Sequence, residues 1–313
     1  MAEIMDWRGP MTYGVHEAVS PLVRRILAPN PGPYTYMGTV TYLVGVQEQI
    51  AVIDPGPKVP SHIHAILSAA EGQRISHIFL THTHLDHSPA ATELKLLTGA
   101  AICGREVRIA DGADGTRKSS MDYGHDQDIV FDTLLAHGQV VAGDGWTLET
   151  IYTPGHTGNH LCYALHEERA VFSGDHVMAW STTAIGPRDG NMTSYMGSLK
   201  ELAARDDAIY WPAHGGPVLR PQMYVNALLR LRMQRRLEIV NKLRIRPLSL
   251  RDLTAFLYRG VDERLSNAAQ QAVIAHLEEL VEANVIEYDE SLSPEGGFRL
   301  RDAASIELVD QGP

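Results

Sequence analysis

Cysteine is nearly absent from this chain of 313 residues, which contains only Cys103 and Cys162. Two thiols in a chain this long form no disulfide framework, and neither lies in a Cys-x-x-Cys motif. We therefore expect both to be small buried core residues. No apolar run approaches the roughly 18 residues of a membrane-spanning helix, and the N-terminus lacks the basic and then apolar regions of an export signal. These absences favour a cytoplasmic protein with no membrane partner.

Positive charge is also scarce, and the formal net charge is −11. This disfavours general affinity for polyanions. Acidic residues exceed basic ones in residues 1–219, whereas Arg220–Arg246 is rich in arginine and holds one acid, Glu238. The length suits two domains of about 150 residues each. The change in charge composition near residue 220 predicts a larger domain at 1–219 and a helical linker with a small second domain at 220–313.

Histidine and aspartate, in contrast, are grouped in four separate segments. The segments read T-H-T-H-L-D-H, T-P-G-H-T, S-G-D-H and P-A-H-G. Together they supply seven metal-binding side chains: His82, His84, Asp86, His87, His156, Asp175 and His214. Imidazoles and carboxylates without a soft thiolate suit zinc, iron or manganese. With 15 histidines in the chain, chance grouping is the alternative, and the four matching contexts disfavour it.

The first segment follows a buried strand expected at Ile75–Thr81, and open α/β sheets place their sites outside such strand ends. A helix is expected to follow at Pro89–Leu97, with Ser88 as its N-cap. A further helix is expected at Ser194–Ala204. His82 and His84 lie two residues apart in extended chain, so both rings can point the same way.

The remaining ligands suggest two neighbouring metal sites. His156 could complete a three-nitrogen site with His82 and His84, which leaves one position open for water. A second site could then be formed by Asp86, His87 and His214, with Asp175 as a carboxylate that bridges both ions. We therefore expect two divalent metal ions per chain, with zinc preferred and iron and manganese as alternatives.

The C-terminal region has the order helix, helix, helix, β-hairpin that is typical of a helical linker and a winged helix. Ser249 begins a capping pattern, S-L-R-D, and Asn284 is a plausible left-handed helix stop. The expected elements are three helices at Pro221–Leu243, Ser249–Tyr258 and Ser266–Ala283, and two strands at Val285–Tyr288 and Phe298–Arg301.

With these motifs and its N-P-G-P…G-T-V-T-Y-L-V-G opening, the chain resembles the metallo-beta-lactamase superfamily, and within it the beta-lactamase-like protein 2 group. That group includes bacterial hydrolases and a mitochondrial endoribonuclease of animals. The resemblance covers almost the whole chain. It implies an α/β protein, an αββα sandwich followed by a small winged-helix domain. It also implies a first metal site and a second one, bridged by Asp175, with these ligands: His82, His84 and His156; Asp86, His87 and His214.

The leading functional prediction is a binuclear metal-dependent hydrolase. A hydroxide bridging the metals would attack a small ester, thioester or lactone, because metal binding brings the pKa of water to about 7. Asp86 and Asp175 would hold the catalytic centre. His176 is a candidate proton donor, although a packing role is favoured. Two other activities remain open: a single-stranded endoribonuclease with the same site, and an iron-dependent persulfide dioxygenase, which the complete second site disfavours.

Nucleic acid is a weaker partner prediction than a small molecule. Arginines of Arg220–Arg246 point in several directions around a helix, which is typical of a solvated face, so single-stranded RNA stays only an alternative. Ser266–Ala283 contains no lysine or arginine, and duplex DNA is therefore not expected. A nucleic-acid-binding regulator without catalysis would not need seven metal ligands. Assembly into a homo-oligomer stays open. His160 is a candidate ligand-orienting residue, and His125 is expected to be a solvated loop histidine.

Overall fold

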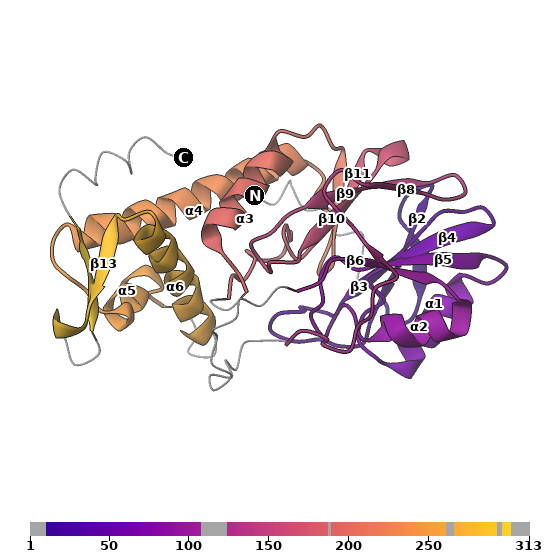
Figure 1. Ribbon diagram of the computed structural model, residues 1–313, viewed down its shortest axis with the longest axis horizontal. Helices are drawn as coiled ribbons and strands as arrows, with labels where there is room; N and C mark the ends of the chain where they lie inside the picture. The colour runs from indigo at the N-terminus through magenta and orange to yellow at the C-terminus, as the bar shows by residue number, and fades with distance from the viewer. Residues whose placement is uncertain (1–10, 108–123, 187–188, 261–265, 293–295, 302–313) are drawn as a thin grey trace.

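A computed structural model of the chain describes residues 11–107, 124–186, 189–260, 266–292 and 296–301. Two β-sheets stack face to face in its larger part (Figure 1). The first sheet has the strand order β1-β2-β3-β4-β5-β6-β7, with these bounds: His16–Ala18, Val23–Leu27, Val40–Val44, Gln49–Ile53, Arg74–Phe79, Ala101–Gly104 and Thr133–Leu134. The second has the order β12-β11-β10-β9-β8, with these bounds: Ile209–Pro212, Ala170–Gly174, Leu161–Leu165, Thr147–Tyr152 and Val140–Ala142.

The space between the sheets is filled by large apolar and aromatic side chains. Tyr42 and Phe79 from the first sheet meet Leu148, Tyr163 and Phe172 from the second in one buried core. Strands β3, β10 and β11 are buried along their whole length. This explains their nearly continuous apolar sequences, because a strand covered on both faces has no solvated side to alternate with. Cys103 and Cys162 are both free and buried, as expected.

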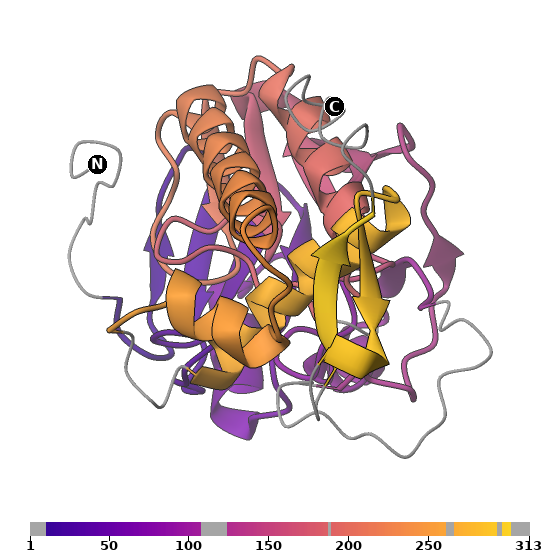
Figure 2. The same ribbon diagram turned by 90° about the vertical axis from the view of Figure 1, so that its left-hand side faces the viewer.

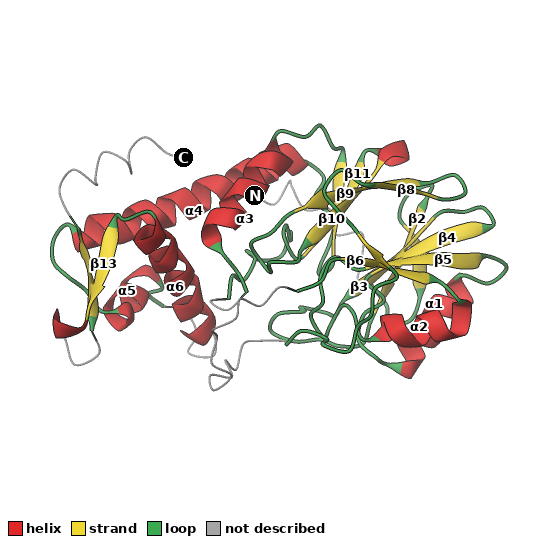
Figure 3. Cartoon of the chain, in the orientation of Figure 1, coloured by secondary structure: helices red, strands yellow, loops and turns green. Residues whose placement is uncertain are grey.

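Helices cover the outer face of each sheet and complete an αββα sandwich, as expected (Figure 3). Helices α1 (Pro60–Ala69) and α2 (Ala90–Thr98) pack their small and branched side chains, such as Ile66 and Leu94, against the first sheet. Helix α3 (Met192–Ala203) and the start of α4 (Pro221–Leu243) cover the second. The layers thus hold the strand ends, where the predicted metal ligands lie, on a rigid frame.

The C-terminal part has the winged-helix order that the sequence predicts. Its elements are α5 (Leu250–Leu257), α6 (Ser266–Glu282), β13 (Ile286–Asp289) and β14 (Gly297–Leu300), with a short 3-10 turn at Glu290–Leu292. The Ser249 side chain accepts a hydrogen bond from the Asp252 N–H and caps α5. Asn284 has a φ of 57°. Both local predictions are confirmed, and Figure 2 shows this part in front of the sandwich.

Helix α4 belongs to two cores at once. Its first half places Val225 and Leu228 in the core beneath α3, and its second half places Ile239, Val240 and Leu243 in the C-terminal core. The division of the chain at residues 219 and 220 therefore stays a prediction, since one continuous helix joins the two parts. In the described part of the chain, no helix combines the length and the apolar character that a bilayer crossing requires.

Two local expectations about helix starts differ from the structure. Pro89, and not Ser88, is the N-cap of α2, because the Ser88 hydroxyl is used elsewhere, 3.3 Å from the carbonyl oxygens of Thr83 and His84. Helix α3 begins at Met192, two residues before the expected start, because the Asn191 side chain accepts a hydrogen bond from the Ser194 N–H at 2.8 Å.

Candidate metal centre

The ligand-bearing loop starts where β5 ends, and Asp54 at the end of the neighbouring strand fixes its first residue. Asp54 Oδ1 accepts a hydrogen bond from the Thr81 N–H at 2.8 Å, and Oδ2 accepts one from the Thr81 hydroxyl at 2.6 Å. Both residues are about 1% exposed. The clamp holds the chain in place immediately before His82, so the loop leaves the sheet in one defined direction.

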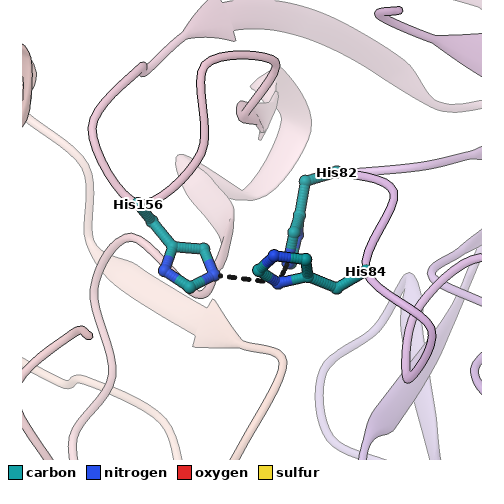
Figure 4. A group of neighbouring side chains, drawn as sticks. All are labelled: His82, His84 and His156. Atoms are coloured by element: carbon teal, nitrogen blue, oxygen red, sulfur yellow. Dashed lines mark hydrogen bonds between the residues drawn. The ribbon is translucent and has the colours of Figure 1, made fainter. Parts of the chain in front are cut away.

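Three imidazoles converge in a first group, shown in Figure 4. His82 Nε2 lies 2.9 Å from His84 Nδ1, and His156 Nε2 lies 3.3 Å from the same atom. Four ligands at about 2.0–2.1 Å from a tetrahedral zinc ion lie about 3.3 Å from one another. Both distances to His84 are close to this spacing, and all three ligand atoms lie within 4.8 Å of one another.

Asp86, His87 and His214 form a second group beside the first. Asp86 Oδ2 lies 3.4 Å from His87 Nε2 and 3.2 Å from His214 Nε2. All three side chains are buried. His214 reaches this point from the loop after β12, 127 residues beyond His87 in the chain (214 − 87), so only the fold brings them together.

Asp175 lies between the two groups. Its Oδ1 is 3.6 Å from His87 Nε2 and 3.3 Å from His214 Nε2, while its Oδ2 is 3.6 Å from His156 Nε2. One oxygen therefore faces the second group and the other faces the first. The structure thus brings all seven predicted ligand residues together, with Asp175 in the place of a bridge.

The donor set fits divalent cations. In the described part of the chain, four buried polar atoms of this cluster have no hydrogen-bond partner: Asp86 Oδ1, His87 Nε2, Asp175 Oδ1 and His214 Nε2. A buried polar atom without a partner costs roughly 1–3 kcal/mol, and several in one place need a common explanation. Metal ions would satisfy these atoms, once the imidazoles of His87 and His214 release a proton on binding.

Hydrogen bonds from outside the cluster fix the orientation of three ligand rings. His87 Nδ1 lies 2.9 Å from Asp54 Oδ2, His214 Nδ1 donates to the Gly38 carbonyl at 3.1 Å, and His156 Nδ1 donates to the Ala184 carbonyl at 2.7 Å. Such partners set the tautomer, so that Nε2 of each ring faces the centre. Asp54 was not among the residues predicted from the sequence, although it stands at a strand end directly before P-G.

Protons are distributed differently over the two groups. Burial and the neighbouring imidazoles hold the pKa of His82 and of His84 well below the ordinary value. In the second group burial also lowers the pKa of His87, but the carboxylates of Asp86, Asp175 and Asp54 outweigh it and raise the pKa well above the ordinary value. Despite burial, Asp175 and Asp86 likewise raise the pKa of His214 to about 10.

Three further histidines surround the cluster. His160 Nε2 accepts a hydrogen bond from the Asp175 N–H at 3.2 Å, which places it where the orienting role was expected. His176 is fully buried, with ring centroids 4.6 Å from Tyr195, and it belongs to none of the ligand groups. His125 was expected to be solvated, but it lies 2.8 Å from the Thr83 hydroxyl oxygen and its side chain is 12% exposed.

Residues 34–214 match the family model of the metallo-beta-lactamase superfamily, which is more than half of the chain. The chain belongs to the metallo-beta-lactamase superfamily. Residues 249–294 match the beta-lactamase associated winged helix domain, which agrees with the order of elements from α5 to β14. The superfamily supports a hydrolase that uses divalent metal ions, and the His and Asp groups described above are able to bind them.

Curated relatives include a beta-lactamase-like protein and fungal thioesterases. The beta-lactamase-like protein 2 homolog of Caenorhabditis elegans is 32% identical over 275 residues, 87% of this chain and 88% of that protein. The atrochrysone carboxyl ACP thioesterase of Paecilomyces divaricatus is 34% identical over 205 residues, 64% of this chain. The chain spans 58% of that thioesterase and 56% of another from Cryptosporiopsis.

Solved structures support the fold alone. A beta-lactamase domain protein from Burkholderia ambifaria has a TM-score of 0.77 at 20% identity, over 94% of this chain and 96% of that one. A metallo-beta-lactamase family protein from Thermus thermophilus has a TM-score of 0.73 at 20% identity, over 91% of this chain and all of that one. Both likenesses extend well past the sandwich, since they cover more of the chain than residues 34–214.

Proposed function

We propose that this chain hydrolyses a small thioester, ester or lactone with two divalent metal ions, most readily a thioester. The convergence of seven His and Asp side chains, four of whose buried atoms lack a partner, carries the proposal. The preference for thioesters rests on the fungal relatives, which are named as acyl-carrier-protein thioesterases. The acidic balance of the chain, with a net charge of −11, supports a small substrate over a polyanion.

The proposed ligands divide as the geometry suggests. The first ion would be held by His82, His84 and His156, the second by Asp86, His87 and His214, and both by Asp175. Zinc is the preferred ion, with iron and manganese as alternatives, since the set contains no thiolate. Bound ions of this kind supply a hydroxide nucleophile at neutral pH and polarise the attacked oxygen.

The chain's own residues keep this centre in order. Asp54 holds His87 through Nδ1, and His160 holds the backbone of Asp175. For His176 we propose a packing role, because its ring lies against Tyr195 and His160 in the protein interior. Asp86 and Asp175 are the proposed catalytic carboxylates, because Asp86 faces the imidazoles of the second group and Asp175 faces imidazoles of both groups.

The single-stranded endoribonuclease alternative would use the four arginines of α4, and three of these four have partners within the chain, whereas Arg230 is exposed. Arg235 Nη1 lies 2.9 Å from Glu238 Oε2, and Arg236 Nε lies 3.0 Å from Glu279 Oε2. Arg232 is 6% exposed. Guanidinium groups held by carboxylates or buried in this way are poorly placed to neutralise phosphates, so a small substrate remains preferred.

A direct test compares substrates on one metal-loaded preparation. Acetyl and benzoyl thioesters of N-acetylcysteamine, followed by thiol release, and a single-stranded RNA oligomer, followed by gel, would be incubated with protein as purified and after chelator treatment. We expect metal-dependent thiol release and intact RNA. Metal-dependent RNA cleavage without turnover of thioesters, esters or lactones would contradict the proposal and favour the ribonuclease.

A further inference from the structure

Two consecutive residues after β11, Thr183 and Ala184, contact two of the proposed metal ligands. The Thr183 hydroxyl lies 2.7 Å from the carbonyl oxygen of Asp175 and 2.9 Å from that of His176. The Ala184 carbonyl accepts the hydrogen bond from His156 Nδ1 at 2.7 Å. We call Thr183 and Ala184 the 183–184 strap. Its position sets the backbone of the proposed bridging carboxylate and the ring of a ligand of the first group.

The strap is held from the C-terminal side by a single side chain of α4. Arg232 Nη2 donates to the Thr183 carbonyl oxygen at 2.6 Å. The guanidinium carbon lies 5.4 Å from the ring centroid of Tyr195 on α3, which is close enough for an attractive contact between cation and ring. Arg232 and Thr183 are 6% and 3% exposed. A direct path of hydrogen bonds therefore runs from α4 through the strap to Asp175 and His156.

The environment of Arg232 is unusual for a buried cation. Within the described ranges it forms no salt bridge, and its Nε has no hydrogen-bond partner. Arg235 and Arg236 on the same helix pair with glutamates. Burying a charge without an opposite charge is costly. A residue kept only for stability would be expected to have a carboxylate partner, so the contact with the strap is the feature that distinguishes Arg232.

We propose that Arg232 is a positioning residue that, through the 183–184 strap, holds Asp175 and His156 in metal-binding geometry. The C-terminal helices would thereby set the metal affinity of a site that lies wholly in the sandwich. This inference rests on the proposed metal-dependent function, because it takes Asp175 and His156 as ligands. It gives α4 a role in the metal centre. This role would not be required if α4 only bound nucleic acid or only packed the two domains together.

The test measures metal binding without substrate. Metal-free wild type, Arg232→Met, Arg232→Lys and the matched control Arg236→Met would be titrated with Co²⁺ and followed by visible absorption. Loss of a partner that orients ligands typically weakens metal binding about 10–100-fold. We expect a loss of that size and an altered absorption spectrum for Arg232→Met, partial recovery for Arg232→Lys, and less than about a threefold change for Arg236→Met.

Wild-type Co²⁺ affinity and spectrum in Arg232→Met would overturn the proposal, whatever the variant does to thermal stability. If Arg232→Met does not fold, Thr183→Val provides the second variant, because it removes the hydroxyl that reaches Asp175 and keeps the side-chain shape. Unchanged Co²⁺ binding in Thr183→Val would then overturn it. Failure of the proposed function is distinguishable, since it would appear as normal Co²⁺ binding in wild type without hydrolysis of any thioester, ester or lactone.

Discussion

The two ligand groups lie side by side yet differ in how they are prepared for an ion. The first consists of three imidazoles, and the pKa of His82 and of His84 lies well below the ordinary value, so these rings are neutral in the metal-free protein. The second adds a carboxylate, and its imidazoles hold protons, since the pKa of His214 rises to about 10. His82 and His84 therefore offer free lone pairs at neutral pH, while the second group must release protons before it binds a metal ion.

The residues around each group explain why the imidazoles of the two groups differ in protonation. His156 of the first group is oriented by the neutral carbonyl of Ala184. His87 of the second is oriented by the carboxylate of Asp54, and Asp175 faces it from the other side. Negative charge near a buried imidazole favours its protonated form. The second group can therefore bind either protons or a metal ion. We expect the two groups to differ in metal affinity and in the pH dependence of metal binding.

The largest effect should follow from removing the residue that the two groups share. Asp175→Ala leaves both groups without their common carboxylate, and we expect turnover of any accepted thioester to fall to the level of the uncatalysed reaction, because neither proposed ion would remain in place. Turnover and metal content by mass spectrometry, measured on one preparation, would show this. Full activity with Asp175→Ala would contradict the bridging role.

His176→Phe tests the residue that follows Asp175, because it keeps a ring beside Tyr195 but removes both ring nitrogens. We expect activity close to wild type. A proton donor is worth roughly 10²–10⁴-fold in rate. A loss of that size in this variant, at full metal content, would identify His176 as the proton donor, a role that the sequence alone left open.

Separate removal of each group should divide the metal content. Wild type is expected to hold two ions per chain, His84→Ala to lose the ion of the first group, and Asp86→Ala to lose that of the second. Each variant would be saturated with Zn²⁺, desalted and analysed for bound metal. One ion in wild type, with no change in Asp86→Ala, would show that the second group holds no metal and would favour the persulfide dioxygenase alternative.

Residue chemistry made the convergence of the seven His and Asp side chains predictable, since several imidazoles and carboxylates grouped at strand ends suit metal binding. The partners that orient the ligands were harder to foresee. Gly38 and Ala184 act through carbonyl oxygens, and every residue has one. His125 and Asp189, 64 positions apart (189 − 125), lie 3.0 Å apart, a contact that only the folded chain creates. The long periodic helix α4 was predicted with its observed bounds, whereas starts of helices, as at Ser88, depended on competing hydrogen bonds.

The pH dependence of binding should also separate the groups. In Asp86→Ala, which isolates the first group, affinity for Zn²⁺ should be nearly constant above about pH 6.5, because the pKa of His82 and of His84 lies well below the ordinary value. In His84→Ala, which isolates the second, affinity should rise with pH toward the pKa of His214, about 10. Calorimetry in buffers of different ionisation enthalpy would count the protons released. Equal release by both variants would contradict the comparison.

The smallest expected effect concerns a buried histidine that belongs to neither group. His276 on α6 is 2% exposed, and burial, followed by the charges of Arg232, Arg235 and Arg236, lowers its pKa to about 3. Folding thus favours the neutral ring. A depressed folded-state pKa contributes stability that is present above the unfolded value of about 6.5 and is lost as the pH falls toward about 3.

Urea unfolding at pH 7.5 and pH 5.0 would measure this contribution. Between about pH 6.5 and pH 5.0 the unfolded chain binds a proton that the folded chain rejects, which amounts to about 2 kcal/mol. His276→Gln should therefore lose less stability than wild type over this interval, even if it is less stable at pH 7.5. His64→Gln, at an exposed position of α1, is the matched control and should keep the wild-type slope. If the free energy of unfolding of His276→Gln changes with pH as much as that of wild type, the His276 ring titrates normally. The arginines of α4 then do not control the charge of this residue on α6.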